Sequence, residues 1–139
     1  MSFVNGPVNT PIRVALIGHC VPDSGMLKSV VSRIFPACEV VRVNDEQTAL
    51  DEVKRSDLLL INRQMDGDFP GVSGMGINLI RELRGVPERK AALILVSNFE
   101  DAQQEAVGIG AAPGFGKAKA GSAEAAERMR AAVEARVRR

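Results

Sequence analysis

Aromatic residues are scarce in this chain of 139 residues, which contains five Phe and neither Trp nor Tyr. Single-stranded nucleic acids are usually held by aromatic side chains on which the bases stack, so this scarcity argues against that class of ligand. The formal net charge is only +1, and no global field favours duplex nucleic acid or an anionic membrane surface. Neither nucleic acid nor a membrane is therefore expected as a partner.

Long apolar runs and cysteine motifs are missing too. No stretch approaches the roughly 20 apolar residues that cross a bilayer, and the start, MSFVNGPVNTP, lacks the pattern of a signal peptide. Cys20 and Cys38 form no CxxC pair and no zinc-like spacing, so they are interpreted as reduced thiols. We expect a cytoplasmic protein with a flexible tail over residues 1–11 and a single domain over residues 12–139.

Catalytic motifs are also lacking. The sequence has no Ser-His-Asp or Cys-His constellation, no metal-binding motif and no GxGxxG after the first predicted strand. The chain is therefore not expected to be an enzyme, and no cofactor is expected.

The chain does contain a regular alternation of apolar runs and helical patterns. Short runs rich in branched apolar residues predict five buried strands at residues 12–18, 39–43, 57–62, 91–98 and 113–117. Apolar residues at helical spacing follow each run, and the last helix begins near residue 122. Its expected inner face consists of Ala126, Met129, Val133 and Val137.

Polar residues mark the expected helix starts. Asp23 or Ser24 is expected at the N-cap of the first helix, because either side chain can accept from the first free backbone N–H groups. Asn44 is expected at the N-cap of the second helix, with Gln47 in the capping-box position.

Five strands alternating with five helices predict an α/β fold, a three-layer αβα sandwich around a five-stranded parallel sheet. We expect the flavodoxin-like strand order 2-1-3-4-5. Ligands of such sheets bind beyond the carboxyl ends of the strands, around the switch between strands 1 and 3. The residues that the pattern brings to this edge are Gly18, His19, Cys20, Asn62, Arg63, Ser97, Asn98 and Lys117.

These landmarks resemble the receiver domain of two-component response regulators, the CheY-like fold, over about residues 12–137. Asn62 ends the third strand with Met65 three residues on, Ser97 ends the fourth strand, and GAAPGFGK supplies Lys117. In that family an aspartate at the end of the third strand accepts a phosphoryl group, and two acidic residues after the first strand help to hold Mg²⁺. A Ser or Thr and a Lys contact the phosphoryl oxygens.

Carried over by position, the resemblance retains the polar half of that site and loses the acidic half. Ser97 and Lys117 match, but the acceptor position is Asn62, and Gly18 and His19 stand in place of the acidic pair. An amide has no anionic oxygen to attack phosphorus, and neither Gly nor His is a hard ligand for Mg²⁺. The resemblance therefore implies a pseudo-receiver, a non-catalytic signalling module that contacts another signalling protein or a second copy of itself.

Two expectations about phosphorylation follow from this pocket. Acetyl phosphate with Mg²⁺ is expected to leave no phosphoryl adduct, and Asn62→Asp alone is not expected to restore one. The triple change Gly18→Asp, His19→Asp and Asn62→Asp has a better chance of restoring phosphorylation, because it introduces all three carboxylates that the site lacks.

An alternative function is sensing of a small molecule or cation in the cleft at the carboxyl ends of strands 1 and 3. The segment from Arg63 to Ser73 is long for a βα connection and would act as a lid. Asp66 and Asp68, with Asp23, would form a cation site, or the Asp, Gly and Pro residues of DGDFPG would only shape a turn. Under a lid, Asp66 or Asp68 is the expected counter-charge for Lys117.

His19 and the arginines of the last helix each allow two interpretations. His19, the only histidine, is either packed among backbone groups or a pH-responsive group or metal ligand beside Cys20 and Asp23. Because the chain ends with its last helix, we expect a stand-alone module. The arginines of that helix would form a solvated face or a partner surface, and they are Arg128, Arg130, Arg136, Arg138 and Arg139.

Overall fold

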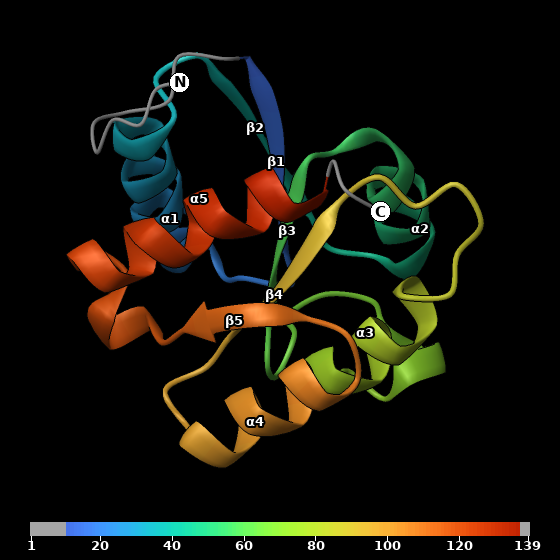
Figure 1. The fold of residues 1–139 in the computed structure, drawn as a ribbon. Coiled ribbons are helices and arrows are strands. Elements are labelled where there is room, and N and C mark those ends of the chain that lie inside the picture. Colours follow the sequence, from blue (N-terminus) through green and yellow to red (C-terminus); the bar gives the residue numbers. More distant parts are fainter. Residues whose placement is uncertain (1–10, 137–139) are drawn as a thin grey trace.

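The chain forms three layers in the computed structural model, which describes residues 11–136 (Figure 1). The strands are β1 Ile12–Ile17, β2 Cys38–Val43, β3 Leu58–Asn62, β4 Ala92–Val96 and β5 Ala112–Phe115. The helices are α1 Val21–Ile34, α2 Glu46–Arg55, α3 Gly76–Leu83, α4 Glu100–Gly108 and α5 Ala123–Arg136, with 3₁₀ turns at Pro70–Val72 and Lys117–Lys119. The predicted alternation is confirmed. The predicted tail over residues 1–11 falls, except for its last residue, outside the described residues, as do Val137, Arg138 and Arg139.

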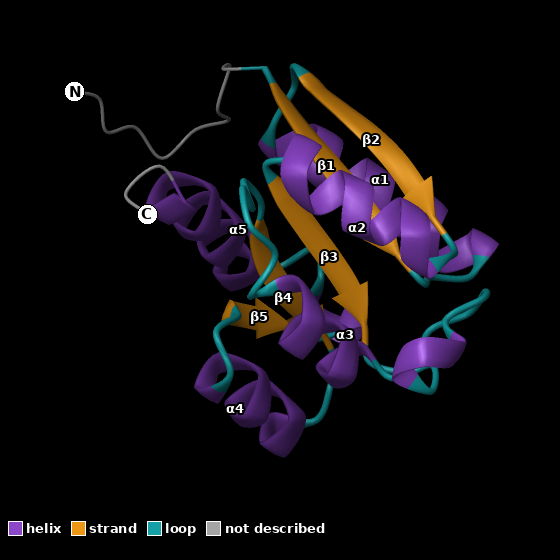
Figure 2. Cartoon of the chain, turned by 90° about the vertical axis from the view of Figure 1, so that its right-hand side faces the viewer, coloured by secondary structure: helices purple, strands orange, loops and turns teal. Residues whose placement is uncertain are grey.

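All five strands are parallel and follow the order β2-β1-β3-β4-β5, which confirms the predicted sheet (Figure 2). The register pairs Ile17 of β1 with Ile61 of β3, and Asn62 of β3 with Val96 of β4. The residues that follow these three strands therefore emerge side by side at one edge of the sheet.

Helices cover both faces of the sheet. Helices α1 and α5 lie on one face, and α2, α3 and α4 lie on the other (Figures 1 and 2). Along β1, Val14 and Leu16 belong to the core beneath α1 and α5, whereas Ala15 and Ile17 belong to the core beneath the other three helices. Burial of both faces explains why the strands are almost continuously apolar rather than alternating.

The starts of the first two helices differ from the prediction. Helix α1 begins at Val21 with Cys20 at the N-cap and no side-chain cap, since Pro22 in the first turn needs no acceptor for its nitrogen. Helix α2 is capped by Asp45, whose Oδ1 accepts from the backbone N–H of Thr48 at 2.8 Å. Asn44 and Gln47 are therefore not the capping pair, and the Gln47 amide donates to Asp51 instead.

The buried face of α5 is rotated slightly from the expected one. Met129 and Val133 are buried as predicted, whereas Ala126 is only partly buried. Ala125 and Ala132 are buried in addition, because their small side chains let the helix approach the sheet closely. Within residues 11–136, no helix is long and apolar enough to cross a membrane.

Candidate functional site

Asn62, the last residue of β3, links the loop after β1 to the loop after β3 through its side-chain amide. Its Nδ2 donates to the backbone oxygen of Gly18 at 3.0 Å and to that of Gln64 at 2.8 Å. Both partners are carbonyl oxygens, which only accept, so the contact requires a side chain that carries hydrogens. A carboxylate in the same place would face two carbonyl oxygens with no proton between them, and the amide is therefore required by the geometry around it.

Gly18 has a backbone conformation and a neighbour that together exclude other residues. Its φ is +74°, in the left-handed region, and a Cβ added there would lie 2.5 Å from the Cβ of Met65. The Gly18 carbonyl also accepts from the backbone N–H of Asp66 at 2.8 Å. Gly18→Asp would displace the loop after β3, which weighs against the triple replacement, whose effect on phosphorylation stays a prediction.

His19 is fully buried. Its Nε2 lies 2.8 Å from the backbone oxygen of Leu60, so Nε2 donates, and Nδ1 is buried with no hydrogen-bond partner among the described residues. The pKa of this imidazole is lowered to about 4, mainly by burial and also by the charge of Lys117, although the Leu60 hydrogen bond and the charges of Asp23 and Asp66 act in the opposite direction. The ring is therefore neutral at pH 7, as in the packed reading and not the pH-responsive one.

Lys117 is paired with an aspartate that the sequence prediction did not choose. Its Nζ lies 2.7 Å from Oδ2 of Asp23, in the first turn of α1. This bond is the main reason that the pKa of Asp23 is lowered. The prediction that Asp66 or Asp68 supplies the counter-charge is wrong, because α1 begins three or four residues earlier than expected and brings Asp23 to Lys117.

The long loop after β3 folds toward α2 and does not form a lid over this pair. Phe69 and Val72 are buried in the core, and the backbone N–H of Gly71 donates to Glu46 at the start of α2. The backbone N–H of Asp68 donates to Asn44 at the end of β2. The loop therefore has a packing role of its own, and the side chains of its aspartates are exposed.

The residues present do not fit a metal ion. Asp23 already binds Lys117, and the His19 ring is fully buried with its Nε2 on a backbone carbonyl, so neither side chain is an accessible ligand beside Asn62. Among residues 11–136, no three His, Cys, Asp or Glu side chains lie close enough together to hold a metal. The structure therefore does not assemble the cation site of Asp23, Asp66 and Asp68, nor one of His19, Cys20 and Asp23, and Mg²⁺ lacks the anionic oxygens that it requires.

Ser97 and Asn98 connect the end of β4 to the end of β5. Ser97 Oγ accepts from the backbone N–H of Phe99 at 3.1 Å, and Asn98 Oδ1 accepts from that of Ala118 at 3.1 Å. Gly116 passes so close to Asn98 that a Cβ there would overlap its side chain. The Ser97 hydroxyl and Lys117 both line one opening at this edge of the sheet.

That opening is a cavity of about 210 Å³ beside Asn62. Its walls contain two cations and no carboxylate, because the α4 acids Glu100 and Asp101 line neighbouring grooves instead. The lining residues are Asn62, Arg63, Gln64, Val96, Ser97, Asn98, Phe99 and Lys117. Of the pocket predicted from the sequence, Asn62, Ser97 and Lys117 line this cavity, whereas Gly18 and His19 lie outside its walls.

Sequence reasoning gave no role to three residues that shape the cavity. The Arg63 guanidinium lies over the ring of Phe99, with its Cζ 4.7 Å from the ring centroid. The Gln103 amide donates to the backbone oxygens of Leu95, Ser97 and Phe115 and so fixes the ends of β4 and β5. The position of Arg63 directly after the third strand was a usable signal, but nothing local marks Phe99 or Gln103.

Comparison with solved structures identifies the fold as that of response regulator receiver domains. NtrX from Brucella abortus superposes with a TM-score of 0.72 at 14% identity, covering 92% of this chain and 28% of that one. The signal receiver domain of NarL from Mycobacterium tuberculosis gives 0.67 at 19% identity, covering 93% and 98%. The response regulator domain of Thermotoga maritima CheB gives 0.66 at 16% identity, covering 90% and 98%.

These likenesses confirm the CheY-like fold predicted from the sequence. At identities of 14% to 19% they establish the fold alone. The sequence matches no protein family model, and it matches no curated protein.

Proposed function

We propose that this protein is a receiver-like signalling module that acts through protein–protein contacts without accepting a phosphoryl group. The observation that carries the proposal is the pair of hydrogen bonds from the Asn62 amide to two backbone carbonyls. The position that would hold the nucleophile is a structural donor, and among residues 11–136 no carboxylate lines the cavity beside it.

The lack of a metal-binding arrangement supports the same conclusion. Phosphoryl transfer to a carboxylate needs cations that neutralise the charge of the transferring group. Lys117 is present, but it is already compensated by Asp23. A non-catalytic role therefore fits the chemistry of this edge better than an enzymatic one.

The signalling role comes from the structural neighbours, which are described as response regulators and receiver domains. The partner is another signalling protein or a second copy of this chain. Two exposed apolar side chains on the α4 side, Phe99 and Val107, are available for such contacts.

The proposal is tested with Asn62→Asp. Incubation with acetyl phosphate and Mg²⁺ followed by intact-mass measurement should show no stable adduct on the wild type or on this variant. The variant should also unfold more easily by about 1–3 kcal/mol in urea, because a carboxylate there leaves the two carbonyls without donors.

Asn98→Asp is the matched control. Its side chain acts as an acceptor toward Ala118, a role that a carboxylate retains, so its stability should stay close to that of the wild type. A stoichiometric phosphoryl adduct on the wild-type protein would refute the proposal.

A further inference from the structure

The cavity beside Asn62 contains a cation that the protein itself does not neutralise. Within residues 11–136, the Arg63 side chain makes no ion pair and no hydrogen bond, and its only assigned contact is with the Phe99 ring. Lys117, the other cation of the cavity, is compensated by Asp23. The cavity therefore carries a net positive charge that originates mainly from Arg63.

The stacking of Arg63 leaves its hydrogen-bonding edge available. A guanidinium carries five N–H donors in its plane, and contact with an aromatic ring uses the face of that plane. The Phe99 ring thus orients the group without consuming its donors. A planar fork of this kind matches the oxygens of a carboxylate or a phosphate in a bidentate arrangement.

The walls of the cavity also supply uncharged donors. The Ser97 hydroxyl accepts from the Phe99 backbone and the Asn98 side-chain oxygen accepts from that of Ala118, and among the described residues the Ser97 hydrogen and the Asn98 amide nitrogen have no assigned acceptor. Gln64 adds a second amide. A cavity of about 210 Å³ accommodates a small anion such as phosphate or acetate but is too small for a nucleotide.

We propose that the cavity beside Asn62 is a reversible binding site for a small oxyanion, a carboxylate or phosphate group, held chiefly by Arg63. This inference rests on the proposed function in one respect, since the anion is bound without a covalent bond to the protein. It names the kind of signal that a receiver fold without an acceptor carboxylate would detect.

The test is a titration of the full chain with inorganic phosphate, sulfate and acetate at constant ionic strength, followed by amide shifts in two-dimensional NMR. Saturable shifts confined to residues 62–64 and 97–99 are expected. Arg63→Gln should weaken binding about tenfold or more, because it removes a charge-assisted contact, and Arg63→Lys should weaken it less. The ranking of the three anions distinguishes a phosphate site from a carboxylate site.

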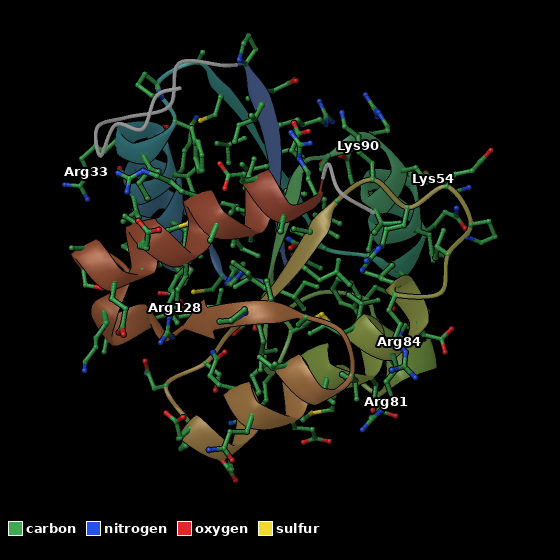
Figure 3. The ribbon with its side chains drawn as sticks, viewed as in Figure 1. Arg33, Lys54, Arg81, Arg84, Lys90 and Arg128 are labelled. Atoms are coloured by element: carbon green, nitrogen blue, oxygen red, sulfur yellow. The ribbon has the colours of Figure 1, made fainter. Side chains whose placement is uncertain are left out.

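Arg33→Gln is the matched control, because it removes the same charge from the exposed last turn of α1 (Figure 3), and Arg33 is not among the residues that line the cavity. Its affinity should equal that of the wild type. Absence of saturable shifts, or equal affinity in the Arg63→Gln protein, would overturn the inference. Intact mass after the titration separates the two proposals, since a covalent adduct refutes the proposed function, whereas failure to bind refutes only the anion site.

Discussion

The two ends of the sheet differ in the polar groups that they bury, which are charged at the amino end and neutral at the carboxyl end. At the amino end, Glu52 and Asp57 are buried as carboxylates, each surrounded by cations. At the carboxyl end, the buried or half-buried polar groups beside β1 and β3 are the neutral ring of His19 and the amide of Asn62. The fold thus tolerates buried carboxylates, but it places them away from the candidate site.

Compensation at the amino end is dense. Arg13 binds Glu52 through two nitrogens at 2.9 and 2.8 Å, and Ser56 donates to the same carboxylate at 2.6 Å. The Arg13 bond is the main reason that the pKa of Glu52 is lowered. Asp57 binds the Arg13 backbone N–H and the guanidinium of Arg136 at 2.9 Å. The Asn62 side chain instead meets two backbone carbonyl oxygens, to which a carboxylate could not donate, and this difference explains why an aspartate would be costly there.

The largest expected effect comes from breaking the amino-end cluster. Arg13→Met keeps most of the side-chain volume but leaves the Glu52 carboxylate buried without its main partner. We expect the free energy of unfolding to fall by about 3–5 kcal/mol, measured by urea denaturation. Arg33→Met, which alters an exposed arginine, is the control and should change it little.

The double variant Arg13→Met with Glu52→Met sharpens the result. It removes both charges, so it should be more stable than Arg13→Met alone, because no uncompensated carboxylate remains. A double variant as unstable as the single one would mean that packing of the arginine stem, and not charge compensation, accounts for the loss.

The sheet and most of its site were predictable, and the exceptions have physical reasons. Both-face burial makes the strands apolar and locates Asn62, Ser97 and Lys117 at one edge, because parallel strands end together. The partner of Lys117 was not predictable from spacing, since it depended on where α1 begins, which is three or four residues before the expected start, with Pro22 in its first turn. Likewise, Arg63 meets Phe99 only through the pairing of β3 with β4, which no local pattern encodes.

The second largest expected effect is a dependence of stability on pH, caused by His19 at the carboxyl end of the sheet. The pKa of His19 is about 4 in the folded protein, against about 6.5 for an unperturbed imidazole. Between these values the unfolded chain binds a proton that the folded one rejects, so stability should fall as pH decreases from about 6.5 to 4. The shift corresponds to at most about 3 kcal/mol.

Urea denaturation across this pH range checks the effect. His19→Gln keeps a donor for the Leu60 carbonyl but does not titrate, so the difference between it and the wild type should flatten above pH 6.5 and change below it. Identical slopes for the two proteins over this range would show that His19 is accessible to protons in the folded state.

The smallest expected effect belongs to the ion pair of Lys117 with Asp23 at the carboxyl end. Lys117 and Asp23 are 27% and 34% exposed, so solvent screens their attraction much more than that of the amino-end cluster. A double-mutant cycle with Lys117→Met and Asp23→Asn should give a coupling of about 0.5–1 kcal/mol, reduced in 1 M salt because screening shortens the reach of charge. The same cycle with Asp66→Asn or Asp68→Asn is the control and should be close to additive, since neither forms an ion pair with Lys117 in the structure.

A stronger coupling to Asp66 or Asp68 than to Asp23 would instead support a lid formed by the long loop. It would also remove the contrast between a compensated amino end and a nearly neutral carboxyl end, because Asp23 would then be free beside His19.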